Sequence, residues 1–207
     1  MDSSLSGLER EFAALSLSGV TETGKELGRG SYGEVREANW LGTPCATKRV
    51  HSLLVSQAGA ADISKASRDF IRECRTWKDL RHPHIVQLLG VVFEQASPLP
   101  VLVMERLSTS LRRFLEDHPK AQFPLNRKAV VLHQVSLALA YLHSLKYIHR
   151  DLSTNNILLD TETCMWKAAK ITDFGVTRVL DTTRSRMTGS LVPGVCMSVC
   201  VCACMYV

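Results

Sequence analysis

The chain has 207 residues, of which 45% are hydrophobic and 22% are charged, and its formal net charge is +5. This length allows one large or two small domains with a sizeable core, and the composition is ordinary for a soluble globular protein. The modest positive charge suits a protein that handles anions, but it gives no reason to expect nucleic acid as a partner.

Cysteine usage and the N-terminus both indicate an intracellular protein. Outside the last fourteen residues the chain has only Cys45, Cys74 and Cys164, which are too scattered for a disulfide framework. Residues 9–11 read Glu-Arg-Glu, where an export signal needs an apolar run. We therefore expect a cytoplasmic protein with reduced thiols.

The first half of the chain predicts strands followed by a helix. Residues 5–15 carry apolar side chains at helical spacing, which indicates either a short amphipathic helix or a frayed leader. Residues 24–50 have the pattern of short strands separated by glycine turns. Residues 62–80 place their apolar side chains on one face of a predicted helix.

The second half adds two more strands and the clearest helix. The apolar runs at residues 82–94 and 100–105 have the length of strands. Residues 125–143 repeat apolar side chains on one helical face, and residues 157–159 form a short apolar strand. Strands first and helices later are typical of an α+β fold with two lobes.

A glycine-rich motif, LGRGSYGEV, places Gly28, Gly30 and Gly33 at G-x-G-x-x-G spacing. Backbone amides approach phosphate oxygens closely only where no Cβ intrudes, so this spacing indicates a phosphate-binding loop. The residues that follow predict strand, turn and strand, which favours a hairpin over the helix of a dinucleotide-binding turn. On this motif alone, a hairpin that binds no ligand is an alternative.

A lysine, Lys48, lies within an otherwise apolar strand in the sequence Ala-Thr-Lys. Such a lysine either extends out to solvent or points at an anion. Glu73 lies on the predicted helix 62–80 and can hold Lys48 by an ion pair, which would leave the ammonium directed at phosphates. Taken alone, each of the two is more simply a solvated surface charge.

Two further motifs, YIHRDLSTNNILLD and KITDFG, place polar side chains in loops. Asp151 follows the long helix and precedes strand 157–159, where its carboxylate can accept the proton of an attacking hydroxyl. Asn156 can supply a neutral oxygen to a hard cation such as Mg²⁺. Asp173 follows a strand and suits a Mg²⁺ that bridges nucleotide phosphates.

These motifs occur in one order: a glycine-rich loop, A-x-K, a helical glutamate, H-R-D-L-x-x-x-N and D-F-G. The set resembles the protein-kinase signature, and from about Glu22 onward the chain is identified as a member of the eukaryotic-type protein kinase family. The sequences HRDLSTNN and ANWLGTPCATKRV resemble the tyrosine-kinase-like group, whose members mostly phosphorylate Ser and Thr. The resemblance implies a small β-rich lobe with one helix and a mostly helical second lobe.

The resemblance also implies a role for each motif residue. Lys48 would hold the α- and β-phosphates of ATP, Glu73 would tether Lys48, and Asp151 would be the catalytic base. Asn156 and Asp173 would bind Mg²⁺. The residues implied to surround the nucleotide are Gly28, Gly30, Gly33, Val35, Ala46, Met104 as gatekeeper, Glu105, Leu107 and Leu158. The residues that resemble the stacked apolar spine of an active kinase are Trp77, Leu88, His149 and Phe174.

The resemblance divides the chain into a leader (1–21), a kinase domain (22–193) and a Val/Cys-rich tail (194–207). Within the kinase domain it implies a small lobe over 22–104 and part of a large lobe over 105–193. The expected activity is transfer of the γ-phosphoryl group of ATP to Ser or Thr of a protein substrate, with Tyr as the second candidate acceptor.

The sequence after the D-F-G motif departs from the family pattern. No Ala-Pro-Glu sequence follows it, so we expect a kinase domain truncated within its activation segment. The alternative is a non-catalytic fragment that binds nucleotide weakly or interferes with a full-length partner. These two hypotheses differ in whether the chain turns over ATP.

The tail, GVCMSVCVCACMYV, concentrates four cysteines: Cys196, Cys200, Cys202 and Cys204. Their spacing differs from the C-x2-C pairs of zinc sites, which disfavours a metal site. Residues 187–207 carry no charge, but proline and glycine interrupt them, so no stable membrane insertion is expected. Because Val and Cys alternate when a GT repeat is translated, we interpret the tail as translated dinucleotide repeat, with a disordered end as another alternative.

Overall fold

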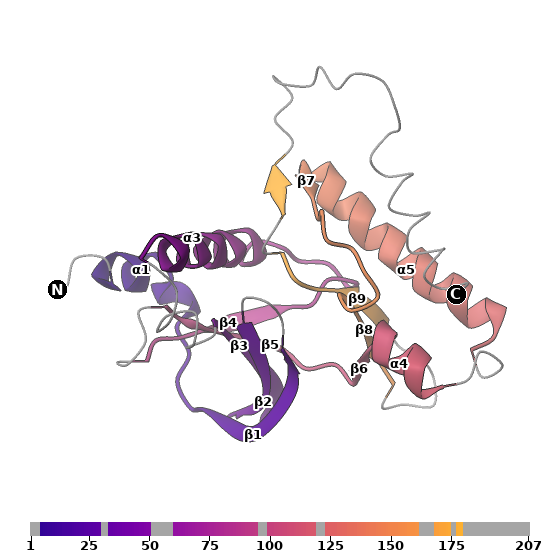
Figure 1. Cartoon of the computed structure of the whole chain (residues 1–207), viewed down its shortest axis with the longest axis horizontal. Coiled ribbons are helices and arrows are strands. Elements are labelled where there is room, and N and C mark those ends of the chain that lie inside the picture. Colours follow the sequence, from indigo (N-terminus) through magenta and orange to yellow (C-terminus); the bar gives the residue numbers. More distant parts are fainter. Residues whose placement is uncertain are drawn as a thin grey trace, which may run out of the picture. The chain divides into compact units, whose positions relative to one another are not determined.

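The computed structural model divides the chain into two compact units, whose elements are labelled in Figure 1. The first unit comprises Met1–Asp79 and Gln87–Arg106, and the second comprises Leu80–Val86 and the chain from Leu107 onward. The residues that the structure describes are 5–29, 33–50, 60–94, 99–118, 123–161, 168–174 and 177–179.

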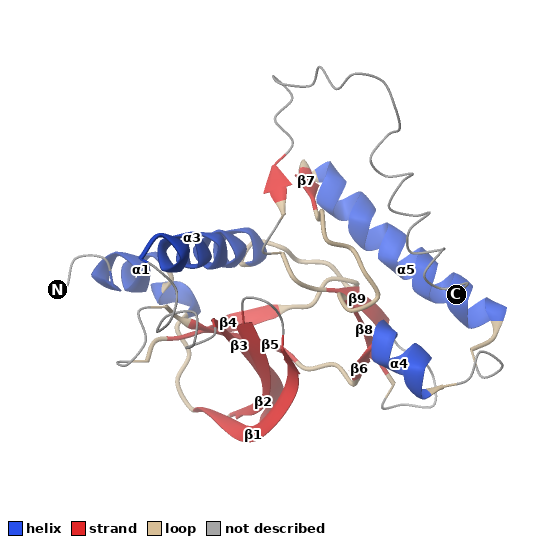
Figure 2. Cartoon of the chain, viewed as in Figure 1, coloured by secondary structure: helices blue, strands red, loops and turns tan. Residues whose placement is uncertain are grey.

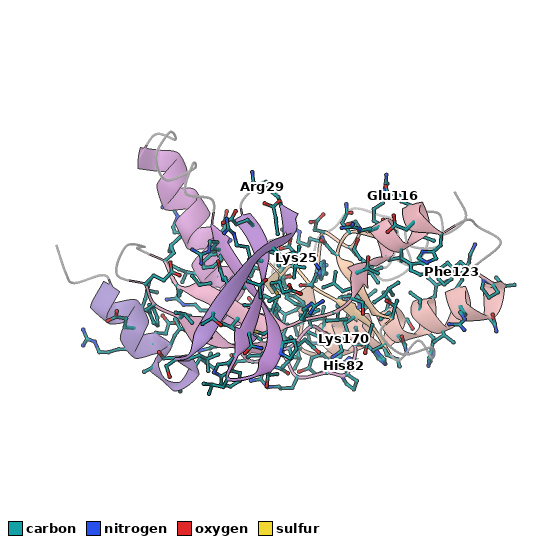
Figure 3. The ribbon with its side chains drawn as sticks, turned by 90° about the horizontal axis from the view of Figure 1, so that it is seen from below. Lys25, Arg29, His82, Glu116, Phe123 and Lys170 are labelled. Atoms are coloured by element: carbon teal, nitrogen blue, oxygen red, sulfur yellow. The ribbon has the colours of Figure 1, made fainter. Side chains whose placement is uncertain are left out.

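The first unit contains a five-stranded antiparallel sheet with the strand order β1-β2-β3-β5-β4. Its strands are β1 (Val20–Arg29), β2 (Gly33–Trp40), β3 (Thr43–Val50), β4 (Leu88–Val92) and β5 (Val101–Glu105). Gly33 opens β2, so a hairpin follows the third glycine, as predicted. The turn from β2 to β3 places Leu41 at φ 50° and Gly42 at φ 91°, which is the left-handed geometry of a tight hairpin. β1 is an edge strand, and Lys25 and Arg29 extend from it (Figure 3).

The described residues of the first unit also form helical segments: α1 (Leu5–Glu11), the 3₁₀ turn η1 (Ala13–Leu15) and α3 (Ala60–Trp77). The N-terminal segment therefore contains the short helix that its apolar spacing predicts. Helix α3 ends three residues before the predicted end at residue 80. Phe70, Cys74 and Trp77 are buried on α3, which agrees with the predicted apolar face.

The apolar run at residues 82–94 is not one strand, and in this respect the prediction is wrong. Only Leu88–Val92 form a strand of the first unit. Ile85 instead forms an isolated parallel bridge with Ile171, and the Val86 N–H donates to the Ile171 carbonyl at 2.9 Å, both within the second unit. Within this run, Val86 forms its backbone hydrogen bond in the second unit, whereas Leu88–Val92 form theirs in the first unit. The apolar composition of the run does not reveal that it is divided between two units.

The described residues of the second unit form two helices and two small sheets, and Figure 2 distinguishes helices from strands by colour. One sheet has the order β6-β8-β9, and in the other β7 pairs with β10. These elements are β6 (Thr109–Ser110), α4 (Leu111–Asp117), α5 (Leu125–Ser144), β7 (Tyr147–Ile148), β8 (Ile157–Asp160), β9 (Ala168–Ile171) and β10 (Arg178–Val179). The hydroxyl of Ser110 accepts a bond from the Arg113 N–H and so caps α4 at its start.

Helix α5 packs on the β8–β9 hairpin through one apolar face. Its buried residues are Val131, Val135, Ala138, Leu139 and Leu142. The Ala169 N–H of β9 donates to Gln134 Oε1 on α5 at 2.7 Å, which joins helix and sheet. Near the start of α5, Phe123 packs edge-on against Phe114 of α4 with ring centroids 5.5 Å apart (Figure 3).

Other apolar side chains of α5 face solvent: Leu125 is 67% exposed, Val130 47% and Leu137 41%. Within the described ranges, no helix has the length and apolar character that a membrane span requires. The predicted activation segment and the cysteine-rich tail fall within residues 180–207, which lie outside the described residues. The interpretations of the tail therefore stay predictions.

Among the described residues of the second unit, three histidines lie where burial lowers their pKa: His82, His84 and His149. His82 stacks on Tyr141 with ring centroids 5.1 Å apart, and its Nδ1 accepts the His84 N–H at 3.1 Å. Burial lowers the pKa of His82, and the neighbouring His84 lowers it further. Burial also lowers the pKa of His84, with Lys170 and His133 acting in the same direction against a hydrogen bond to the Ala169 carbonyl. Burial lowers the pKa of His149.

These lowered pKa values predict that mild acid destabilises the folded chain. Near pH 6.5 the imidazoles of the unfolded chain bind protons, whereas the same imidazoles in the folded chain bind fewer. The free energy of unfolding is therefore fully retained above this pH and falls as the pH drops below it. We expect the urea midpoint to decrease between about pH 7 and pH 5, a window above the titration of ordinary carboxylates. A His84→Gln variant should show a shallower decrease, and a constant midpoint in the parent would contradict the prediction.

Candidate active site

Strand register gathers four of the predicted nucleotide-site residues on one face of the sheet. Val35 pairs with Lys48, and Ala46 pairs with Met104. Directly opposed residues of antiparallel strands share a face, and so do residues two apart along a strand. Ala46 and Met104 are buried, whereas Val35 and Lys48 are partly exposed. This face therefore presents apolar side chains beside a single ammonium group from β3.

The ion pair predicted between Lys48 and Glu73 is present. Lys48 Nζ lies 2.6 Å from Glu73 Oε1, and the two side chains are 17% and 4% exposed. Lys48 comes from β3, the central strand of the sheet, and Glu73 comes from α3. Because both charges are largely removed from water, the mutual compensation of the two charges matters. The pair consequently ties the position of α3 to the centre of the sheet.

The glycines of the predicted phosphate loop lie where β1 ends and β2 begins. Gly28 pairs with Val35, and Gly33 is the first residue of β2. A Cβ at Gly28 would meet nothing within 4 Å, so packing does not require a glycine there. Gly30 lies outside the described residues. Space above the Gly28 backbone is compatible with the close approach of a phosphate.

Two residues are predicted to contact adenine through their backbone: Glu105, the last residue of β5, and Leu107 in the segment that follows. The Glu105 N–H donates to the Gln87 carbonyl at 3.0 Å, and Glu105 Oε1 accepts the Gln87 N–H at 2.6 Å. Arg106 forms an ion pair with Glu37 of β2 at 2.9 Å, which sequence reasoning missed because 69 positions separate the two. Leu107 is half-buried and begins the main segment of the second unit.

Asp151 and Asn156 meet in the second unit, in the loop between β7 and β8. Asn156 Nδ2 donates to Asp151 Oδ2 at 3.0 Å and to the Asp151 carbonyl at 2.8 Å. These two bonds use both amide hydrogens of Asn156 and orient its side chain, so the neutral Oδ1 is its remaining polar atom. Asp151 itself is exposed to solvent. The loop thus combines an accessible carboxylate with an oriented amide oxygen.

His149 connects this loop to the residue before Asp173. Its Nε2 donates to the Thr172 carbonyl at 2.9 Å, and its Nδ1 accepts the Asp151 N–H at 3.4 Å. A neutral imidazole with its proton on Nε2 satisfies both bonds, and this form agrees with the pKa that burial lowers. The Thr172 N–H also donates to the Asn156 carbonyl at 3.0 Å. Sequence reasoning placed His149 only in an apolar spine and missed this hydrogen-bonding role.

Two residues of these motifs adopt left-handed backbone geometry. Arg150 has φ 69° and Asp173 has φ 67°. Such values are uncommon for residues other than glycine and occur often where a functional site imposes local strain. Arg150 precedes Asp151 and Asp173 follows Thr172, so both strained positions lie beside residues to which His149 is hydrogen-bonded.

The four residues predicted to form an apolar spine are all buried, two in each unit. Trp77 and Leu88 belong to the first unit, and His149 and Phe174 belong to the second. His149 and Phe174 pack edge-to-face with ring centroids 5.4 Å apart. Leu158 of β8, predicted to lie beneath adenine, is half-buried and pairs with Lys170 of β9.

The donor set of the second unit fits a hard divalent cation that is held jointly with phosphates. Asn156 offers an amide oxygen and Asp173 a carboxylate, which are the oxygen ligands that Mg²⁺ prefers. Within the described part of the chain, no group of three or more His, Cys, Asp or Glu side chains could hold a metal ion by itself. Mg²⁺ usually takes one or two protein carboxylates and completes its shell with water and substrate phosphates.

The residues on the sheet face of the first unit and the polar loop residues of the second unit together indicate the class of protein. A family model for protein tyrosine and serine/threonine kinases matches residues 21–199, and the chain belongs to this family. The antiparallel sheet with α3, the Lys48–Glu73 pair and the arrangement of Asp151, Asn156 and Asp173 agree with that membership.

Several named kinases are similar to this chain. The protein R831 of Acanthamoeba polyphaga mimivirus, whose name describes a serine/threonine-protein kinase/receptor, is 35% identical over 159 residues, or 76% of this chain and 9% of that protein. The kinase kinX of Dictyostelium discoideum, named as a serine/threonine-protein kinase, is 31% identical over 75% of this chain and 13% of its own length. Tyrosine-protein kinase FRK of Homo sapiens is 33% identical over 75% of this chain and 28% of its own length. The chain thus spans less than a third of the length of each of these relatives.

The buried ion pair leads to a prediction about stability. Replacing Lys48 by Met removes its ammonium from the buried Glu73 carboxylate, which should lower the free energy of unfolding by roughly 3 kcal/mol. Lys48→Met combined with Glu73→Gln should recover most of that loss, because the unpaired charge is gone. Urea denaturation of the single and double variants measures both effects, with Lys25→Met on the exposed strand β1 as the control. Equal stability of Lys48→Met and Lys25→Met would contradict the buried pair.

Proposed function

We propose that this chain is a protein kinase domain that binds Mg·ATP and transfers the γ-phosphoryl group to serine or threonine of a protein substrate. The observation that carries the proposal is the Lys48–Glu73 ion pair on a sheet face that also bears Val35, Ala46 and Met104. An ammonium held in place by a carboxylate beside an apolar surface suits a nucleotide, which has an apolar base and charged phosphates.

The first unit supplies the proposed contacts to adenine and to the phosphates. ATP provides the phosphoryl group, and bound Mg²⁺ neutralises charge on the phosphates. Lys48 presents its ammonium to the α- and β-phosphates, and Glu73 prevents that ammonium from turning toward solvent. Gly28, Gly30 and Gly33 let backbone amides approach the phosphates. Proposed adenine contacts come from Val35, Ala46, Met104, Glu105, Leu107 and Leu158.

For Glu105 the proposed adenine contact falls to its carbonyl oxygen, because its N–H donates to Gln87. An adenine amino group is a donor and requires such an acceptor. Leu107 is proposed to contribute a backbone N–H for a ring nitrogen of adenine. Met104, the proposed gatekeeper, is buried on the same face of the sheet as Ala46. There it is proposed to limit how deeply the adenine base can enter.

The second unit supplies the proposed base and metal ligands. Asp151 is accessible, and the amide of Asn156 holds its carboxylate in one orientation. Asp151 is therefore the proposed acceptor for the proton of the attacking hydroxyl. Asn156 Oδ1 and the Asp173 carboxylate are the proposed ligands of Mg²⁺. Most of the catalytic effect would come from positioning and charge compensation, as is general for phosphoryl transfer.

The preference for serine and threonine rests on the sequence of the loop. Ser153 occupies the position where typical Ser/Thr kinases have Lys, and the loop HRDLSTNN differs from the HRDLAARN of most tyrosine kinases. The mixed loop resembles the tyrosine-kinase-like group, whose members mostly modify Ser and Thr. The similar proteins include kinases named for either specificity, so the acceptor has to be determined by experiment.

Nucleotide binding is the first consequence to test. At a concentration of about 100 times its Kd, a ligand stabilises the folded state by about 2.7 kcal/mol, which corresponds to a shift of a few degrees in Tm. We expect Mg·ATP to raise the Tm of the parent chain and EDTA to abolish that rise. Lys48→Met and Asp173→Asn should lose the shift, whereas Asp117→Asn on the exposed surface of α4 should keep it. An undiminished shift in Asp173→Asn would exclude its role in metal binding.

Phosphoryl transfer is tested separately, with labelled ATP and peptides that contain Ser, Thr or Tyr. Phosphoamino-acid analysis should detect phosphoserine and phosphothreonine. Asp151→Asn should lower the rate by about 10²- to 10⁴-fold, the usual contribution of a general base, and keep the Mg·ATP shift. Phosphotyrosine alone would overturn the proposed acceptor. A Mg·ATP shift without transfer to any peptide would favour the alternative of a nucleotide-binding fragment.

A further inference from the structure

The segment that precedes the sheet, residues 8–17, is packed against α3 and β4. We call it the N-terminal clamp. Phe12 is only 1% exposed, and Lys78 Nζ lies 5.8 Å from its ring centroid. Ser16 forms a parallel bridge with Val91 of β4, and the Leu17 N–H donates to the Val91 carbonyl at 2.8 Å. The clamp is therefore attached by a buried aromatic ring and by backbone hydrogen bonds.

A bidentate ion pair joins the clamp to α3. Arg75 Nε and Nη2 donate to the two carboxylate oxygens of Glu11 at 2.6 and 2.7 Å. This hydrogen bond to Arg75 holds the pKa of Glu11 below its usual value. An exposed ion pair contributes little to stability on its own, but the bidentate geometry fixes the direction of both side chains. Figure 1 labels α1, which ends at Glu11, and α3.

Close contact between the clamp and β4 depends on Gly90. A Cβ at this position would lie 2.4 Å from the Leu15 carbonyl oxygen and 2.5 Å from Leu17 Cγ. Real Cβ atoms do not approach other atoms so closely, so any larger residue would displace the clamp or the strand. The register of β4 on β5 also shifts between Leu88 and Gly90. The strand is thus shaped to receive residues 15–17.

The clamp and the sheet hold α3 from different sides. Glu73 and Arg75 are two residues apart, which corresponds to about 200° around a helix. Glu73 points to Lys48 on the sheet, and Arg75 points to Glu11 on the clamp. Cys74 and Trp77, whose directions around the helix lie between those of Glu73 and Arg75, are fully buried. Rotation of α3 about its axis would therefore break both ion pairs together.

From this geometry we infer that Glu11 and Phe12 are positioning residues, through which the N-terminal clamp keeps α3 in the orientation that pairs Glu73 with Lys48. The effect on nucleotide binding rests on the function proposed above. The effect on the ion pair itself does not, because the state of Lys48 can be measured without nucleotide. Release of the clamp would let α3 turn and would separate the Lys48 amine from the Glu73 carboxylate.

The test exposes the folded full-length chain to an amine-reactive reagent. Digestion and mass spectrometry then measure the rate at which Lys48 is acylated. An amine bound to a carboxylate reacts slowly, so Glu73→Gln defines the rate of the amine without the Glu73 carboxylate. We expect Glu11→Gln and Phe12→Ala to raise the Lys48 rate several-fold toward that limit. Glu9→Gln, a matched change at an exposed glutamate on the same helix, should leave the rate at the parent value.

Two further variants separate positioning from a loss of stability. Exchanging the charges with Glu11→Arg and Arg75→Glu should restore the slow Lys48 rate that Glu11→Arg alone loses. Gly90→Ala should raise the rate without altering any charge, because it displaces residues 15–17. Circular dichroism confirms that each variant is folded at the temperature of the assay. Folded Glu11→Gln, Phe12→Ala and Gly90→Ala variants that keep the parent rate would overturn the inference.

A parallel titration with Mg·ATP keeps this inference distinct from the proposed function. If the parent chain binds Mg·ATP, the clamp variants should bind it several-fold more weakly, in proportion to their Lys48 rates. If the parent binds no Mg·ATP, the proposed function fails, while a raised Lys48 rate in the variants still supports the clamp. If the parent binds and the Lys48 rates are unchanged, the clamp is overturned and the proposed function stands.

Discussion

The ion pair between Lys48 and Glu73 is the interaction on which the first unit depends. Lys48 lies on the central strand of a five-stranded sheet, and Glu73 lies on α3, with their charged atoms 2.6 Å apart and little exposed. A buried pair of this kind gives little net stability, but removal of either partner leaves an uncompensated charge. Its effect is therefore to define one orientation of α3. The packing of Cys74 and Trp77, and the attachment of Glu11 to Arg75, are compatible with that orientation.

The second unit depends on a neutral histidine instead of a charge pair. His149 is fully buried, and its two ring nitrogens bond to the backbones of Asp151 and Thr172. A neutral imidazole can donate at one nitrogen and accept at the other, which an apolar residue at this position could not do. These bonds, together with those of Asn156, stabilise the left-handed conformations of Arg150 and Asp173. The burial of His149, the tautomer of its ring and the left-handed backbone at Arg150 and Asp173 therefore depend on one another.

The order and type of the elements could be predicted from local patterns. Glycine punctuation predicted the hairpin that opens at Gly33, and apolar periodicity predicted α3 and α5. The ion pair of Lys48 and Glu73 was also predicted, because the combination of motifs made it more than a pair of surface charges. The prediction of the fold was less complete where backbone groups form hydrogen bonds with residues far away in the sequence. The apolar run 82–94 divides between two units, and α4 with its Ser110 cap was not anticipated, although a serine before Leu-Arg-Arg-Phe-Leu is a start signal for a helix.

The sequence by itself determined the chemistry available to this protein: one lysine in an apolar strand, a helical glutamate, two loop aspartates, an asparagine and three closely spaced glycines. These features are local, since residue type and spacing of up to a few turns suffice to state them. Only the tertiary structure decided which atoms meet. It brought Glu11 to Arg75 across 64 positions, Arg106 to Glu37 across 69, and His149 to Thr172 across 23. Such partners depend on the path of the whole chain, because a hydrogen bond or ion pair forms only where packing has already brought its two groups within about 3 Å.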